Sequence, residues 1–264
     1  MSAPYVPPRR YPPMFSVRRE WTDSLSQAFE RAGRTALELH DVRDITFLRD
    51  PPQGLKFLRV TSRYGADDTP AFSVESLEML DIYTRCKREI SFPAESRLSD
   101  LTVQDRAGLE TTGTLSKLES LTVHDYQRGD LGWMPNMGLT ELTVVSKARS
   151  AEGIRDLSGL RRTPMLSQLI LSSLTPATPL DGLDSLSKLR YVSLEFQCSW
   201  EGGALDLAPL APLPLERIDL TCVPLVTSWV PLTSNPTLRR VVLMGGRPKA
   251  LDNSPLDHDG LTIL

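Results

Sequence analysis

The stretch Leu118–Val123 reads LESLTV, with apolar side chains at its first, fourth and sixth positions. Side chains of a β-strand alternate between its two faces, so the fourth and sixth positions share one face. The third, fifth and seventh positions point to the opposite face. The stretch therefore predicts a short strand that is apolar on one face and polar on the other.

The same spacing recurs ten times along the chain, and successive units begin 20 to 27 residues apart. Every unit has leucine at its first position: Leu55, Leu77, Leu98, Leu118, Leu139, Leu166, Leu189, Leu215, Leu238 and Leu261. The tenth unit ends at its fourth position, Leu264, and Arg34, Leu37 and Leu39 fit one degenerate unit upstream. A self-similar period of this length predicts a solenoid, because stacked units bury a continuous apolar column that one unit cannot bury alone.

These repeats resemble those of the leucine-rich repeat family over about residues 34 to 264, and Leu180–Leu194 is similar to the short bacterial internalin-type repeat. The resemblance implies an α/β-type solenoid: a curved parallel β-sheet of about ten leucine-rich repeats, with irregular or short helical convex segments. Apolar residues suited to the convex wall fall in the second halves of the units: Phe72, Val74, Leu109, Leu115, Ile154, Leu157, Leu160, Leu180, Leu183, Leu186, Leu205, Leu207 and Leu210.

One feature of the family is missing from this chain. Family members carry an Asn three residues after the sixth position, where it forms a buried hydrogen-bonded ladder. Here that position holds other residues, among them Arg63, Arg106 and Tyr126. Because Arg is seldom buried without a partner, we expect the turn after each strand to differ from that of the family.

The chain is predicted to have three parts. Residues 1–20 are proline-rich and predict an extended arm. Residues 21–33 predict an amphipathic helix, in which Ser24 and Gln27 resemble a capping box and Gly33 suits the end. The open apolar end of a solenoid needs a cover, so this helix is interpreted as an N-terminal cap, with a partner-binding helix as the alternative. Residues 34–264 form the solenoid.

Composition indicates an ordinary globular protein, with 40% hydrophobic and 24% charged residues. The net charge of −3 argues against nucleic acid as the main partner. No apolar stretch approaches the roughly 18 residues that cross a bilayer, and residues 1–13 do not resemble a secretory signal. Three scattered cysteines, Cys86, Cys198 and Cys222, favour reduced thiols and a cytoplasmic protein. Arg outnumbers Lys by 24 to 6, which indicates the GC-rich codon usage of a bacterium.

The C-terminal strand is expected to lie at an open sheet edge, which can pair with another chain. Three interpretations remain: a homodimer through this edge, a partner that completes it, or tolerance of a short edge strand.

The outward strand face is where a family member usually binds, so the predicted site lies there. Its middle is acidic and hydroxylic, and a few aromatic residues could anchor a partner protein. Strand propensity alone also explains the threonines at the fifth positions, Thr102, Thr122 and Thr143. The predicted partner-binding residues are Phe57, Arg59, Tyr83, Asp100, Gln104, Asp105, His124, Asp125, Glu141 and Tyr191.

Basic residues follow the strands and are expected to line one rim of the solenoid. This rim could steer an anionic partner, or its members could simply pair with neighbouring acids. The predicted rim residues are Arg63, Arg85, Lys87, Arg88, Arg106, Arg128, Lys147 and Arg149.

Catalysis finds little support in the sequence. His124, with Asp125 beside it, lacks a second His, a Cys at ligand spacing and a nucleophile, so neither an enzyme, a metal site nor a cofactor is predicted. We therefore predict a non-catalytic protein-protein interaction module that binds a partner through its concave strand face. The alternative is an accessory, regulatory or immunity subunit of an enzyme or toxin, held by the N-terminal arm and the basic rim.

Overall fold

The computed structural model describes residues 11–135, 138–146, 153–175, 177–197, 203–256 and 262–264. These residues fall into two compact units, and the division lies between His124 and Asp125, within one strand. The N-terminal unit holds described residues 11–124, and the C-terminal unit holds those from 125 onward.

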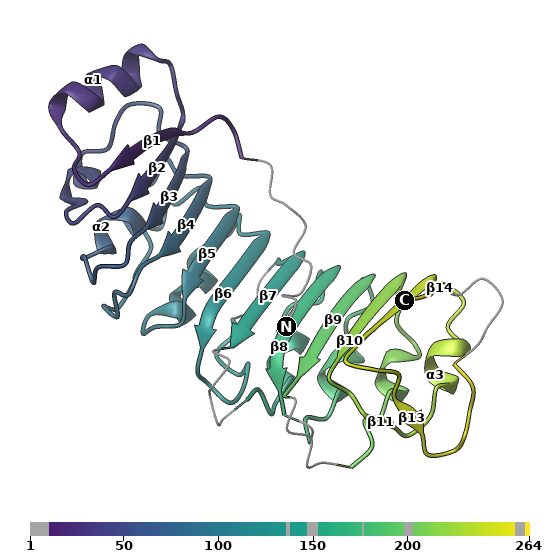
Figure 1. The fold of residues 1–264 in the computed structure, drawn as a ribbon. Coiled ribbons are helices and arrows are strands. Elements are labelled where there is room, and N and C mark those ends of the chain that lie inside the picture. The colour runs from purple at the N-terminus through teal and green to yellow at the C-terminus, as the bar shows by residue number, and fades with distance from the viewer. Residues whose placement is uncertain (1–10, 136–137, 147–152, 176, 198–202, 257–261) are drawn as a thin grey trace. The chain divides into compact units, whose positions relative to one another are not determined.

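Parallel strands in chain order build the N-terminal unit, side by side in Figure 1. Its strands are β1 (Phe15–Arg18), β2 (Ala36–His40), β3 (Phe57–Thr61), β4 (Met79–Tyr83), β5 (Asp100–Gln104) and β6 (Ser120–Tyr126). Each fourth-position residue pairs with the fourth position of the next strand, as Leu80 does with Leu101. Because these leucines are buried, the repeat register predicted from the sequence is confirmed here.

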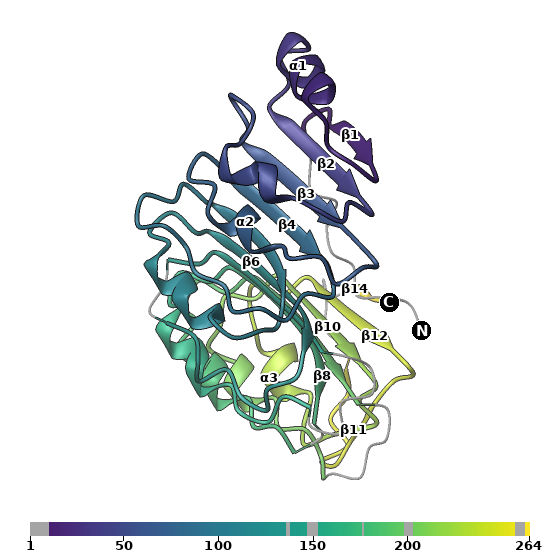
Figure 2. The ribbon, with the colours of Figure 1, turned by 90° about the vertical axis from the view of Figure 1, so that its left-hand side faces the viewer.

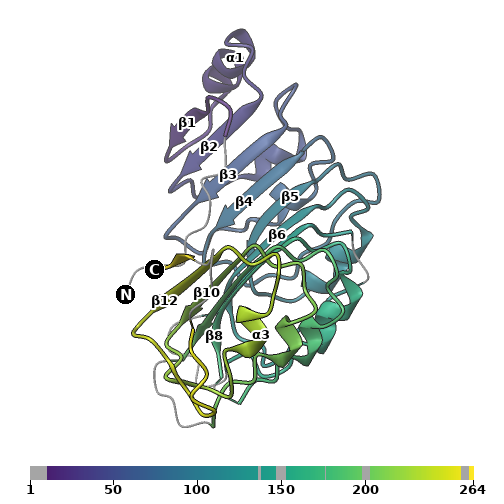
Figure 3. The same ribbon diagram turned by 90° about the vertical axis from the view of Figure 1, so that its right-hand side faces the viewer.

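The C-terminal unit continues the same pattern of parallel pairing. Its strands are β7 (Glu141–Ser146), β8 (Gln168–Leu174), β9 (Tyr191–Phe196), β10 (Arg217–Thr221), β12 (Arg240–Met244) and β14 (Thr262–Ile263). Two further short strands, β11 (Leu225–Val226) and β13 (Lys249–Ala250), pair with each other in a separate small sheet. Figure 3 shows β8, β10 and β12 of this sheet, with α3 on one side of them.

The helices described in the segments that return from one strand to the next are short. They are η1 (Thr46–Arg49), α2 (Thr69–Phe72), η2 (Leu109–Thr114), η3 (Ser158–Arg162), η4 (Asp181–Leu183), η5 (Ala208–Leu210) and α3 (Val230–Thr233). All thirteen apolar residues predicted for the convex wall are buried. The chain is therefore a leucine-rich repeat solenoid, as its repeat spacing predicts.

A strand and a helix precede β2, and we interpret them as the N-terminal cap (Figure 2). Helix α1 (Asp23–Arg31) begins after Thr22, whose side chain caps it in place of the predicted Ser24. Phe29 is fully buried, and its ring meets Phe15 of β1 edge to face at 5.7 Å. Residues 15–18 were expected to belong to an extended arm, but they pair with β2, because Phe15 and Val17 supply the alternating apolar pattern of a strand.

The turns that follow the strands use left-handed backbone where the family has its usual turn. Positive φ angles occur directly after the seventh position, for example at Asp41 (52°), Asp125 (53°) and Cys222 (59°). Two of the residues that replace the family's Asn, Arg106 and Tyr126, are buried. The departure from the family's usual turn stays a prediction from the sequence.

The last strand departs from the predicted register. Leu264 was expected at the inward fourth position, yet Ile263 is the residue that pairs with Val241, the fourth position of β12. A slip of one residue exchanges the two faces of a strand, and Leu264 is accordingly 65% exposed. Leu261, the predicted start of this unit, lies outside the described residues.

Candidate functional site

The outward strand face of the N-terminal unit is only partly accessible. From β3 to β6, positions three and seven are partly or fully exposed, as at Phe57 and Tyr83. At the fifth positions, Glu38 and Arg59 are partly exposed, whereas Asp81, Thr102 and Thr122 are buried. Position five was expected to point outward. From β4 to β6 its side chain is covered by those of the flanking residues, because adjacent strands lie only about 4.8 Å apart.

A ladder of alternating charge runs along the fifth positions of β2, β3 and β4. Backbone register places Glu38 opposite Arg59, and Arg59 opposite Asp81. Arg59 lies 3.5 Å from a Glu38 carboxylate oxygen and donates hydrogen bonds of 3.2 and 3.3 Å to Asp81 Oδ2. Glu38 also accepts from Ser16 at 2.8 Å and lies 3.1 Å from His40 Nε2.

Tyr11 from the N-terminal arm closes this ladder. Its hydroxyl donates to Asp81 Oδ2 at 2.7 Å, and the Arg59 guanidinium carbon lies 4.0 Å from the centre of its ring. The Asp81 side chain is only 1% exposed as a result. Sequence reasoning missed this contact, because nothing in the proline-rich sequence around Tyr11 indicates where its side chain will pack.

Electrostatic coupling within the ladder shows in two pKa shifts. Burial raises the pKa of Glu38, but hydrogen bonds from Ser16 and His40 and nearby positive charge outweigh it, so the net pKa is lowered. Burial lowers the pKa of Arg59, but interactions with Tyr11 and Asp81 outweigh it and raise the net pKa. Both groups are therefore held in their charged forms.

The predicted partner-binding residues of this unit do not form one uniform patch. Tyr83 is 37% exposed, and its ring lies 5.3 Å from that of His124, two strands away. Phe57, Asp100 and Gln104 are part-exposed. Asp105 is buried, which contradicts its expected place on an open acidic face. With Asp81 also buried, the expected acidic centre is smaller than the sequence suggests.

The remaining predicted residues, Asp125, Glu141 and Tyr191, belong to the C-terminal unit. Tyr191 donates to Asp219 Oδ2 at 2.9 Å, and burial followed by the Asp219 charge raises the pKa of Tyr191 to about 12. Arg217 donates to both oxygens of the same carboxylate at 2.8 and 2.7 Å.

The predicted basic rim is interrupted. Arg106 is buried and donates to both carboxylate oxygens of Asp68, at 2.7 and 3.1 Å, with its guanidinium over the Phe72 ring. Arg88 pairs with Asp67, as the alternative of neighbouring acids predicts. Lys147 and Arg149 lie outside the described residues.

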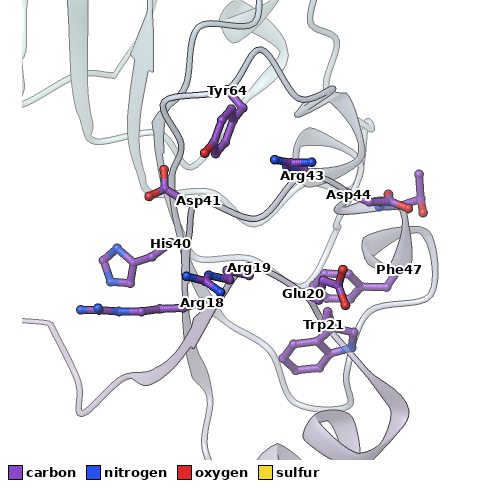
Figure 4. A pocket seen from close by; sticks show the side chains of 11 residues that line it. Arg18, Arg19, Glu20, Trp21, His40, Asp41, Arg43, Asp44, Phe47 and Tyr64 are labelled. Atoms are coloured by element: carbon purple, nitrogen blue, oxygen red, sulfur yellow. The ribbon is translucent and has the colours of Figure 1, made fainter.

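A cavity of about 980 Å³ opens beside the ends of β1 and β2 in the N-terminal unit (Figure 4). Trp21 and Phe47 stack with ring centres 4.6 Å apart, and Arg43 lies over the Tyr64 ring at 5.1 Å. Three arginines and three carboxylates line the cavity, so its charge favours neither an anionic nor a cationic ligand. The charged lining residues are Arg18, Arg19, Arg43, Glu20, Asp41 and Asp44.

Asp67, Asp68 and Cys86 place possible metal-ligand atoms within 4.8 Å of one another. Both carboxylates already face arginines, Asp67 facing Arg88 and Asp68 facing Arg106. This arrangement is that of two ion pairs, and we assign no metal to it.

The cysteines differ from the expectation of three reduced thiols. Cys86 is free and buried, whereas Cys222 is disulfide-bonded. Cys198 lies outside the described residues. Among the described residues, no helix is long and apolar enough to cross a bilayer.

Comparison with known proteins supports the fold. No protein-family model matches the sequence, and no curated protein matches it significantly. Among solved structures, an internalin (InlF) of Listeria monocytogenes is similar, with a TM-score of 0.52 and 19% sequence identity. The match covers 78% of this chain and 60% of that one, so this chain corresponds to about three-fifths of the internalin. At this identity the likeness shows the leucine-rich repeat fold alone.

Proposed function

We propose that this chain is a non-catalytic module that binds a partner protein through the outward strand face of its repeats. The observation that carries the proposal is the Tyr83–His124 pair, an exposed aromatic side chain beside an imidazole on a rigid sheet. Interface centres are enriched in such aromatic anchors, and a sheet holds them in place at little entropic cost.

The surrounding side chains suit the rim of such an interface. Phe57, Arg59, Asp100 and Gln104 are all partly exposed on the same unit. Polar and charged residues around an aromatic centre contribute selectivity more than affinity. In the C-terminal unit, Glu141 and the Tyr191 cluster are the corresponding candidates. Asp105 is less suited, because it is buried.

The alternative of an accessory or immunity subunit held by the arm and the basic rim has less support. The rim loses Arg106 to the buried pair with Asp68. The arm places Tyr11 on the chain's own strand face. Cytoplasmic location, a bacterial source and a homodimer through β14 remain predictions from the sequence.

The test is affinity capture from the native source followed by a binding titration with the recovered protein. Tyr83→Ala should weaken the complex by about 1–3 kcal/mol, because it removes the aromatic anchor. Its melting temperature should change little, since Tyr83 is exposed.

Glu110→Lys is the matched control, because Glu110 is exposed on η2, away from the strand face. It should bind as tightly as the unmodified chain. Loss of binding by Glu110→Lys alone would move the site to the convex side and end the proposal.

A further inference from the structure

The same trio of side chains, an aspartate, an arginine and a tyrosine, occurs in the described part of each unit. In the C-terminal unit, Asp219 accepts hydrogen bonds from Tyr191 and Arg217, and the guanidinium carbon lies 5.1 Å from the centre of the tyrosine ring. Asp219 is 2% exposed. Strands β9 and β10 carry all three residues, and Tyr191 pairs directly with Arg217, so backbone pairing fixes the trio.

In the N-terminal unit the aspartate and the arginine come from neighbouring strands, and the tyrosine comes from outside the sheet. Asp81 of β4 accepts from Arg59 of β3 and from Tyr11, and the guanidinium lies over the ring. Tyr11 precedes β1, and Pro12 and Pro13 separate it from Met14 and the strand. No sheet register therefore holds this tyrosine in place.

The chemistry of the site favours an aromatic side chain that carries a hydrogen-bond donor, as Tyr11 does. Asp81 is almost fully covered, so a group seated there must donate a hydrogen bond to the carboxylate. The ring must also offer its face to the Arg59 guanidinium, which favours an aromatic side chain. Phenylalanine lacks the donor, and serine or threonine lacks the ring.

We propose that Arg59 and Asp81 form a tyrosine-binding site, that Tyr11 fills it in the free protein, and that a partner replaces Tyr11 with a tyrosine of its own from an extended segment. The proposal rests on the proposed function, because it places part of the partner on the same strand face. The arm then acts as an intramolecular competitor, whose strength is set by its high effective concentration.

The test uses the full-length chain and a synthetic peptide of residues 9–14, RRYPPM, acetylated and amidated. Peptide affinity is measured by NMR titration for the unmodified chain, for Tyr11→Ala, and for Tyr64→Ala as a matched control. Tyr64 is an exposed tyrosine of the same unit, and its ring packs against Arg43. We expect Tyr11→Ala to bind the peptide about tenfold more tightly than either other chain, because the competitor is gone.

A second peptide, with phenylalanine in place of tyrosine, should bind Tyr11→Ala about tenfold more weakly, because it cannot donate to Asp81. Equal affinity of the two peptides would overturn the proposal. So would equal affinity of the unmodified chain and Tyr11→Ala, or a lack of binding to Tyr11→Ala. If circular dichroism shows that Tyr11→Ala does not fold, the Tyr11→Phe variant, which keeps the ring, takes the place of Tyr11→Ala in the same comparison. The experiment needs no external partner, so its failure is distinguishable from failure of the Tyr83 test.

Discussion

At the scale of single residues, two adjacent aspartates, Asp67 and Asp68, are expected to contribute very differently to stability. Asp68 and Arg106 have side chains that are 1% and 0% exposed, and Asp68 also accepts from the buried Thr84 hydroxyl. Asp67 and Arg88 have side chains that are 30% and 68% exposed. Removing one partner of a buried pair leaves an uncompensated charge, whereas an exposed pair contributes little.

Asp68→Ala should therefore lower the free energy of unfolding by about 3–5 kcal/mol, and Asp67→Ala by less than about 1 kcal/mol. Chemical denaturation of the two variants measures the difference. The double variant Asp68→Ala with Arg106→Met should be more stable than Asp68→Ala alone, because the buried charge is gone. Equal losses for Asp67→Ala and Asp68→Ala would show that Arg106 is not buried as described.

Arg106 shows how much of the structure can be predicted from the sequence. Leucine spacing predicts which side chains form the core, since alternation on a strand is a local rule. The same spacing places Arg106 on an exposed basic rim. Its partner Asp68 is 38 residues away, so no local pattern indicates that the two side chains pair. Tyr11 and Asp81 are 70 residues apart, and neither shows a pattern that announces the other. Contacts across repeats depend on which side chains the stacking brings together, so they become visible only in the structure.

At the scale of elements, the cap is the part of the fold that the sequence predicts incompletely. Helix α1 lies where the amphipathic pattern indicates, but β1 is four residues long and gives too short an apolar alternation to stand out from a proline-rich arm. The tenth repeat is misplaced by one residue for a related reason. Leu261, Ile263 and Leu264 offer two registers, and only pairing with β12 selects one.

Deleting residues 1–13 should therefore change the free energy of unfolding only modestly, because β1 stays whole. Deleting residues 1–18 should lower it by about 2 kcal/mol or more and promote aggregation, because it removes buried Val17, uncovers Phe29 and opens the edge of β2. Thermal melting with light scattering distinguishes the two chains. Indistinguishable behaviour of the truncations would remove β1 from the cap.

At the scale of the whole molecule, the cysteines bear on where the protein folds. A disulfide consumes two thiols, and Cys222 is disulfide-bonded while Cys86 is free. The chain contains three cysteines. Structural disulfides persist in oxidising compartments and are rare in the cytoplasm, the location predicted from the sequence.

Protein purified without reductant and then denatured should titrate one thiol per chain with a thiol-specific chromophoric reagent. Reduction should lower the free energy of unfolding by about 2–4 kcal/mol, because the unfolded chain regains the freedom that the crosslink removes. Cys222→Ser should be insensitive to reductant, whereas Cys86→Ser should keep the full response. Three titratable thiols in freshly purified protein would contradict the disulfide and favour a cytoplasmic protein; one thiol would favour folding in an oxidising compartment, with the partner of the strand face to be sought there.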